Sequence, residues 1–189
     1  IDRILADMPH LIDGMIEGAE RTRDIVDALK RFSAVDKATP EQVNLNEVVE
    51  RSVRWVVQSA SAKFAVDVDL PADLLCSGSS GQLQQVVMNL VQNACDATAN
   101  LSAARLKVSG SREGGMAVLR FADNGPGIAE AHLGRLFEPF FTTKPVGQGT
   151  GLGLSISYGI VERHGGKLSA RNLPEGGAEF ELSLPVESR

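Results

Sequence analysis

The sequence predicts an α+β fold in which a two-layer α/β sandwich follows a long bundle-forming helix. Three observations support this prediction. The N-terminal segment has apolar residues at helical spacing, several later segments alternate apolar and polar residues as strands do, and helical patterns lie between those strands. This order of elements implies a mixed, largely antiparallel sheet with its helices on one face.

Residues 8–33 form the first predicted helix. Their apolar side chains recur at spacings of three and four from Met8 to Phe32, with a second row beside them, which is typical of a helix inside a bundle. A single amphipathic helix cannot bury its stripe alone, so we expect it to pack on another helix, from this chain or from a second copy in a homodimer. We assign residues 1–36 to this unit and the polar stretch 37–42 to a linker.

Residues 43–189 form the second predicted domain. Asn46 is expected to cap its first helix, whose valines recur at helical spacing. A strand of alternating residues begins at Phe64 and stops at Pro71. The valines of the first helix are Val49, Val53, Val56 and Val57. The remaining elements are expected at about 80–98 (helix), 105–110 and 116–122 (strands joined by a turn at 113–115), 151–164 (helix), and 167–171 with 178–184 (a final hairpin).

Composition excludes several classes of protein. The chain has 189 residues and a net charge of −5, which argues against a nucleic-acid-binding surface. Its longest apolar runs fall far short of the ~18 residues that span a bilayer, so we expect no membrane contact. Cys76 and Cys95 are too few for a disulfide framework or a zinc site, and we expect both to be reduced in a cytoplasmic protein. Because the chain does not begin with Met, we expect it to be part of a longer protein, whose membrane anchor, if it has one, lies elsewhere.

The helix predicted at 80–98 carries a pair of amides. Asn89 and Asn93 are four residues apart and share one face, whereas Val86, Leu90 and Ala94 point to the core. An amide carbonyl is a neutral oxygen ligand suited to a magnesium ion that also holds phosphate oxygens. From this helix alone, two surface or capping amides are an equally good interpretation.

Three further stretches bear glycines, phenylalanines or a cation. The segment 123–127 (Asp-Asn-Gly-Pro-Gly) follows a strand, where glycines let a flat ligand approach and Asp123 can accept hydrogen bonds from an exocyclic amine; a plain turn is the alternative. The segment 147–154 (Gly-Gln-Gly-Thr-Gly-Leu-Gly-Leu) runs into a helix whose first amides can bind phosphate. Before it, 136–144 contains three phenylalanines that we expect to anchor a loop to the core, and Lys144, which either reaches a phosphate or is a solvated cation.

In this order and spacing, the four stretches closely resemble the N, first-glycine, phenylalanine and second-glycine boxes of bacterial sensor histidine kinases, which share a superfamily with gyrase, mismatch-repair and heat-shock chaperone ATPases. The resemblance covers about residues 43–186. Residues 8–33 resemble the second helix of the dimerisation and histidine-phosphotransfer hairpin of these kinases.

The resemblance implies a binding site for ATP with Mg²⁺. Asn93 is implied to coordinate the magnesium ion and Asp123 to accept a hydrogen bond from the adenine amine, under a lid at 128–148. Many family members have a basic residue three positions after the magnesium asparagine; Asp96 occupies that position here, so we expect Lys144 to supply the charge. The implied ATP-binding residues are Asn89, Asn93, Asp123, Gly125, Gly127, Phe141, Thr143, Lys144, Gly147, Gly149, Thr150, Gly151, Leu152 and Gly153.

The resemblance also implies transfer of the γ-phosphoryl group to a histidine and then to an aspartate in the receiver domain of a response regulator. His10 lacks the acidic neighbour and the downstream proline of the family's acceptor, His132 lies in the lid, and His164 lies at a helix end. We therefore expect the acceptor helix to be absent from this chain. Related hydrolytic ATPases have a water-activating glutamate where this chain has Asn89, which favours transfer over hydrolysis.

Two alternatives remain open from the sequence. One is a serine/threonine kinase of the anti-sigma type, which shares the ATP-binding fold but lacks a helical hairpin. The other is a degenerate module that binds no nucleotide and serves as a dimerisation platform, although its intact glycine boxes argue against this.

Overall fold

The computed structural model describes residues 41–60, 64–72, 74–145 and 149–186, together with Ile12, Gly14, Met15 and Gly18, which have helical backbone and are exposed. The rest of the predicted bundle helix and most of the predicted linker lie outside the described residues.

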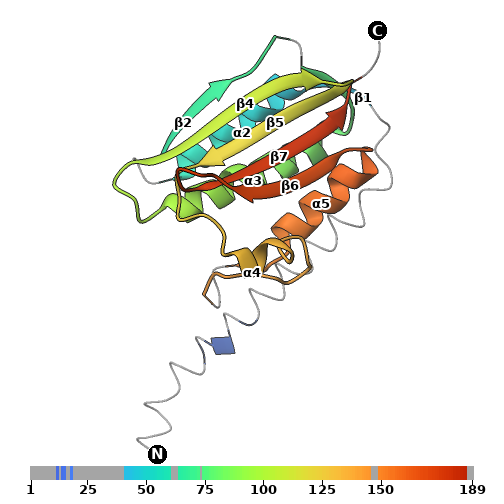
Figure 1. Cartoon of the computed structure of the whole chain (residues 1–189). Helices are drawn as coiled ribbons and strands as arrows, with labels where there is room; N and C mark the ends of the chain where they lie inside the picture. The colour runs from blue at the N-terminus through green and yellow to red at the C-terminus, as the bar shows by residue number, and fades with distance from the viewer. Residues whose placement is uncertain are drawn as a thin grey trace, which may run out of the picture.

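A five-stranded sheet forms one layer of the domain. The strands are β2 (Phe64–Asp69), β4 (Ala104–Glu113), β5 (Met116–Asp123), β6 (Lys167–Asn172) and β7 (Ala178–Pro185), in the spatial order β2-β4-β5-β7-β6. β2 pairs parallel with β4, and the other neighbours are antiparallel. The helices α2 (Leu45–Ser59), α3 (Ser80–Thr98) and α5 (Gly153–Arg163) cover one face of this sheet (Figure 1). The predicted α+β sandwich is confirmed.

A second sheet of two strands was not predicted. β1 (Glu41–Asn44) pairs antiparallel with β3 (Leu75–Gly78), so that Val43 lies opposite Cys76. The strand therefore begins inside the stretch assigned to the linker. Each strand has only four residues, which is too short for a clear periodic pattern. A helix and another strand separate the two in the sequence, so neither strand indicates its partner.

The predicted start of α2 was wrong by two residues. Asn44 is the cap, because its side-chain oxygen accepts a hydrogen bond of 3.0 Å from the backbone N–H of Asn46. The Asn46 side chain instead donates to the carbonyl oxygen of Pro71 at 2.9 Å. Val57, predicted to be on the apolar face, is 39% exposed, whereas Leu45, Val48, Val49 and Val56 are buried.

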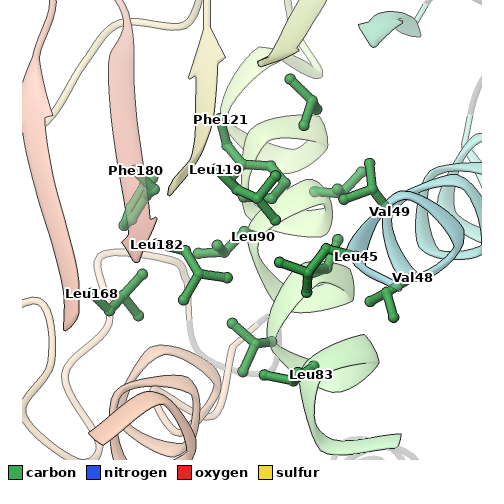
Figure 2. Close-up of a cluster of buried hydrophobic side chains, with 14 of the residues drawn as sticks. Leu45, Val48, Val49, Leu83, Leu90, Leu119, Phe121, Leu168, Phe180 and Leu182 are labelled. Carbon is green, nitrogen blue, oxygen red and sulfur yellow. The ribbon is translucent and has the colours of Figure 1, made fainter. Parts of the chain in front are cut away.

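The core lies between the helical layer and the sheet, and α3 runs through its middle. Leu83, Leu90, Leu119 and Leu182 are all at most 1% exposed, and Figure 2 shows that Leu83 and Leu90 of α3 lie between the sheet leucines and α2. Each such leucine stabilises the fold by about 1.5–3 kcal/mol. As predicted, Val86, Leu90 and Ala94 of α3 are buried, and Asn93 is half-buried at the edge of this face.

One short helix in the region predicted to be a lid was not expected. α4 (Glu130–Leu133) is a single turn that follows the loop after β5. Within the described part of the chain, no helix combines the length and apolarity needed to cross a membrane.

Candidate functional site

A cavity of about 900 Å³ opens between α3, the loop after β5, the segment 128–145 and the start of α5. It is lined by residues from all four predicted boxes. Ten predicted site residues lie in its lining: Asn93, Asp123, Gly127, Phe141, Thr143, Lys144, Gly149, Thr150, Gly151 and Gly153. Asn89, Gly125 and Leu152 lie next to it but do not line it, and Gly147 lies outside the described residues.

Asp123 is the most buried charged side chain in the lining of this cavity, and we call the part of the cavity around it the closed end. Only 6% of the residue is exposed. Its Oδ1 atom accepts hydrogen bonds from the backbone N–H groups of Gly125 at 2.8 Å and Ala178 at 3.3 Å. Burial raises the pKa of Asp123, and the two backbone N–H groups partly offset that increase. Because Oδ1 is held in this way, Oδ2 is the oxygen available to a ligand.

Gly177, which the sequence analysis did not single out, makes this arrangement possible. Its φ is +89°, and a Cβ atom there would lie 2.0 Å from the carbonyl oxygen of Asp123. Only glycine fits a backbone that passes so close with that dihedral angle. The Gly176-Gly177 pair in the sequence signalled a turn, but not that the turn packs beneath Asp123.

The two α3 amides have different surroundings. Asn93 lines the cavity, and its side-chain amide has no hydrogen-bond partner within the described segments. Asn89 donates through Nδ2 to the carbonyl oxygen of Gly153 and to Oγ of Ser157, both at 3.1 Å. Asn93 is thus free to bind a ligand, whereas Asn89 ties α3 to the first turn of α5.

The glycine-rich stretch enters α5 later than predicted. The helix begins at Gly153, because Gly151 has a φ of +67° that cannot continue a right-handed helix. A Cβ atom at Gly151 would lie 2.4 Å from the carbonyl carbon of Phe140, so the backbone of 140 packs directly on this glycine. Leu152 is buried at 9% exposure and anchors the helix start to the core.

Of the three phenylalanines, Phe137 anchors the lid region to the core as predicted, whereas Phe141 contacts other residues of the lid region. Phe137 packs on Tyr158 of α5 with ring centroids 5.2 Å apart. Phe141 contacts the ring of His132 at 5.4 Å and lies beneath the guanidinium of Arg135 at 4.7 Å. For Phe140 the prediction was wrong, since its side chain is 60% exposed.

Charged and polar side chains meet at the mouth of the cavity. Lys144 forms an ion pair with Asp96 of α3, and Asp96 also accepts a hydrogen bond of 2.7 Å from Nε2 of Gln92. Lys144 is therefore a cation at the predicted place, but its partner in this structure is a carboxylate. Among the described residues, no group of three or more His, Cys, Asp or Glu side chains could hold a metal ion.

His164 lies at the end of α5, as predicted, and has a structural role. Its Nδ1 atom lies 2.8 Å from the carbonyl oxygen of Ile160, and Nε2 accepts a hydrogen bond of 3.1 Å from the backbone N–H of Ser79. The ring thus joins the end of α5 to the residue that precedes α3.

Comparisons with known proteins agree with this geometry. Residues 78–188 match the model of the histidine kinase-, DNA gyrase B- and HSP90-like ATPases. The chain is 44% identical to the two-component sensor PprA of Pseudomonas aeruginosa over 132 residues, which cover 66% of this chain and 14% of PprA. It is 33% identical to the sensor histidine kinase ZraS of Escherichia coli O157:H7 over 182 residues, which cover 94% of this chain and 38% of ZraS.

A solved structure shows the same fold. The mycobacterial sensor histidine kinase MprB superposes with a TM-score of 0.71 at 28% identity, covering 80% of this chain and 100% of that one. The chain spans well under two-thirds of the length of the curated relatives named above. It belongs to the family of histidine kinase-, DNA gyrase B- and HSP90-like ATPases, and it carries the ATPase domain found in sensor histidine kinases.

Proposed function

We propose that this chain is the ATP-binding kinase core of a two-component sensor histidine kinase. It binds ATP with Mg²⁺ and transfers the γ-phosphoryl group to a histidine, from which the group passes to an aspartate of a response-regulator receiver domain. The observation that carries the proposal is a single cavity with a buried carboxylate at its closed end and an unpartnered amide, glycines and a lysine nearer its mouth.

The closed end suits the adenine base. Oδ2 of Asp123 can accept a hydrogen bond from an exocyclic amine, because backbone N–H groups hold Oδ1. Ala97, Ile128 and Leu154 supply apolar lining for the faces of a planar ring. A purine with a carbonyl in place of that amine would face the carboxylate with an acceptor, so the site favours adenine over guanine.

The residues nearer the mouth suit a magnesium ion and phosphates. The unpartnered amide of Asn93 offers the kind of oxygen that Mg²⁺ accepts together with phosphate oxygens and water. When bound, the ion would neutralise charge on the phosphates. Gly149, Thr150 and Gly151 line the cavity just before the N-terminus of α5, where backbone N–H groups can receive phosphate oxygens.

Phosphoryl transfer depends on positioning and charge neutralisation more than on covalent help from the protein. Asn89 holds the first turn of α5 against α3 and so fixes the phosphate end of the cavity. Position 89, one helical turn before Asn93, therefore holds an amide and not a carboxylate that could activate water. We therefore propose slow hydrolysis and transfer to a protein acceptor, which is a histidine on the first hairpin helix of the full protein.

Nucleotide titration tests the proposal. ATP should bind with Mg²⁺ at micromolar concentrations, and Asn93→Ala should remove the magnesium dependence. Asn100→Ala is the matched control, because Asn100 is an exposed asparagine in the turn after α3. Magnesium-dependent binding that persists unchanged in Asn93→Ala would contradict the assignment.

The two alternatives from the sequence are not favoured, because the relatives named above are a two-component sensor and a sensor histidine kinase. The stability of the phosphorylated product separates the kinases: phosphohistidine is labile to acid, and phosphoserine is not. Equilibrium dialysis with ATP tests the nucleotide-free module.

The proposed partners follow from the same assignment. We propose a homodimer that forms through the helical hairpin, a response-regulator receiver domain as the next phosphate carrier, and no nucleic-acid partner. The proposed location is the cytoplasm, which is compatible with Cys76 and Cys95 as thiols outside any disulfide. Any membrane anchor is assigned to other parts of the full protein.

A further inference from the structure

Asn172, the last residue of the edge strand β6, makes an unusual contact with the loop that follows β5. Its Oδ1 atom accepts a hydrogen bond of 2.7 Å from the backbone N–H of Ile128, and its Nδ2 atom donates one of 2.7 Å to the carbonyl oxygen of the same residue. One side-chain amide thus pairs with both backbone groups of Ile128, as a neighbouring strand would.

This contact holds a wall of the cavity. Gly127, Ile128 and Ala129 line the cavity, whereas Asn172 stands behind them. A Cβ atom at Gly127 would lie 2.9 Å from Oδ1 of Asn172, so the absence of a side chain at 127 lets the amide approach. The side chain of Ile128 also packs against the core.

The loop has few other supports. At its start, the Asn124 amide bonds to the backbone of Ala103 and Arg105, and the N–H of Gly125 donates to Asp123. At Ile128, both backbone hydrogen bonds within the described part of the chain go to Asn172. Asn172 is therefore, with Asn124, one of two side-chain amides that hold the backbone between Asp123 and α4.

We propose that Asn172 is a positioning residue for nucleotide binding: it sets the distance between the 127–129 wall and Asp123, and thereby the width of the base end of the cavity. The inference rests on the proposed ATP site and adds a residue that lies outside the four boxes. Because Asn172 acts at the base end, its loss should lower the affinities for adenosine, ADP and ATP by the same factor. A residue that acts on the phosphates would affect ATP most.

The test compares Asn172→Ala and Asn172→Asp with the wild-type chain. The aspartate keeps the acceptor for the Ile128 N–H but opposes the Ile128 carbonyl with a second oxygen. Glu175→Gln, an exposed change in the adjoining β6–β7 turn, is the control. Binding of adenosine, ADP and Mg-ATP is measured by calorimetry, amide exchange at Ile128 by NMR, and unfolding by denaturant.

We expect Asn172→Ala to weaken all three ligands on the order of 10-fold, the loss of about two neutral hydrogen bonds. The Ile128 amide should exchange faster, Asn172→Asp should change both readouts in the same direction, and Glu175→Gln should change neither. Because Asn172 is exposed, the variants should still unfold cooperatively. Unchanged affinities in a folded Asn172→Ala, or a loss confined to ATP, would overturn the inference. If wild-type protein bound no nucleotide, the proposed function itself would fall.

Discussion

Lys144 and Asp96 form an ion pair that connects the lid region to α3 across the mouth of the cavity. Both side chains retain 35% exposure, so the pair should contribute less than about 1 kcal/mol to folding. Its importance lies in competition, because a bound triphosphate and the Asp96 carboxylate attract the same ammonium group.

The first prediction concerns this competition. Asp96→Ala should raise the affinity for Mg-ATP a few-fold, because it frees Lys144 and removes a negative charge close to the phosphates. Lys144→Ala should lower ATP affinity by a similar factor. Adenosine binding should be unaffected by either change, and the effects on ATP should shrink at high salt. Calorimetry of both single variants and the double variant measures the coupling. Equal effects on adenosine and ATP would show that the pair does not act through phosphate.

The second prediction concerns ligand binding by Asp123. In Asp123→Asn, the side-chain oxygen should keep accepting from Gly125 and Ala178, which leaves an NH₂ group facing the ligand amine. Loss of a charged acceptor should weaken ATP binding roughly 10- to 100-fold. Asp67→Asn, a change at an exposed aspartate of β2, is the control. The affinity for guanine nucleotides should fall less than the affinity for adenine nucleotides in this variant.

The same variant tests pH dependence. Because burial raises the pKa of Asp123 above its ordinary 3.8, the folded protein binds this proton more tightly than the unfolded chain does. At neutral pH the ionised carboxylate therefore lowers the free energy of unfolding, and Asp123→Asn should be the more stable protein. That advantage should shrink as pH falls through the raised pKa and vanish below 3.8. Denaturant titrations over this range, read as the difference between the two proteins, measure it. A difference in free energy of unfolding that does not change with pH would show that the pKa of Asp123 is not raised.

The third prediction compares two neighbouring glycines in the β6–β7 turn. Gly176 and Gly177 have φ values of +98° and +89°, but a Cβ atom at Gly176 would meet nothing within 4 Å. Gly176→Ala should therefore cost only the backbone strain, about 1–3 kcal/mol. Gly177→Ala adds the collision with Asp123 and should cost roughly 1–3 kcal/mol more, with weaker ATP binding. Equal losses of unfolding free energy in the two variants would contradict the packing of this turn under Asp123.

The fourth prediction concerns Asn89. Asn89→Ala removes the donor to Gly153 and Ser157 and should lower the free energy of unfolding by about 1 kcal/mol. Gln85→Ala, one turn earlier on α3, should have a smaller effect. In a double-mutant cycle with Ser157→Ala, the two changes should be non-additive, because they remove a shared contact. Additivity would indicate that Asn89 does not hold α5 in solution.

Local patterns were enough to predict the long elements of the described domain and ten of the residues that line the cavity. The bounds of α3 match the prediction because nineteen residues with a clear apolar face leave little freedom. Asp123, Asn93 and the glycines at 149–153 carry their signals in short, contiguous motifs.

Other features depend on residues far apart in the sequence. Asn172 and Ile128 are separated by 44 positions and Lys144 and Asp96 by 48, and nothing local to either member indicates its partner. The prediction of the α2 cap was wrong for a different reason. Asn44 and Asn46 are equally good capping residues, and only the pairing of β1 decides between them.

The contact between Asn89 and α5 has a consequence for ligand exchange. With α3 and α5 fastened together behind the phosphate end, and the sheet behind the base end, the rear of the cavity is a fixed surface. Nucleotide must therefore enter and depart through the front, past Lys144 and the segment that carries Phe141. We therefore expect the rate of ADP release to depend on that front segment, and not on any separation of the two helices.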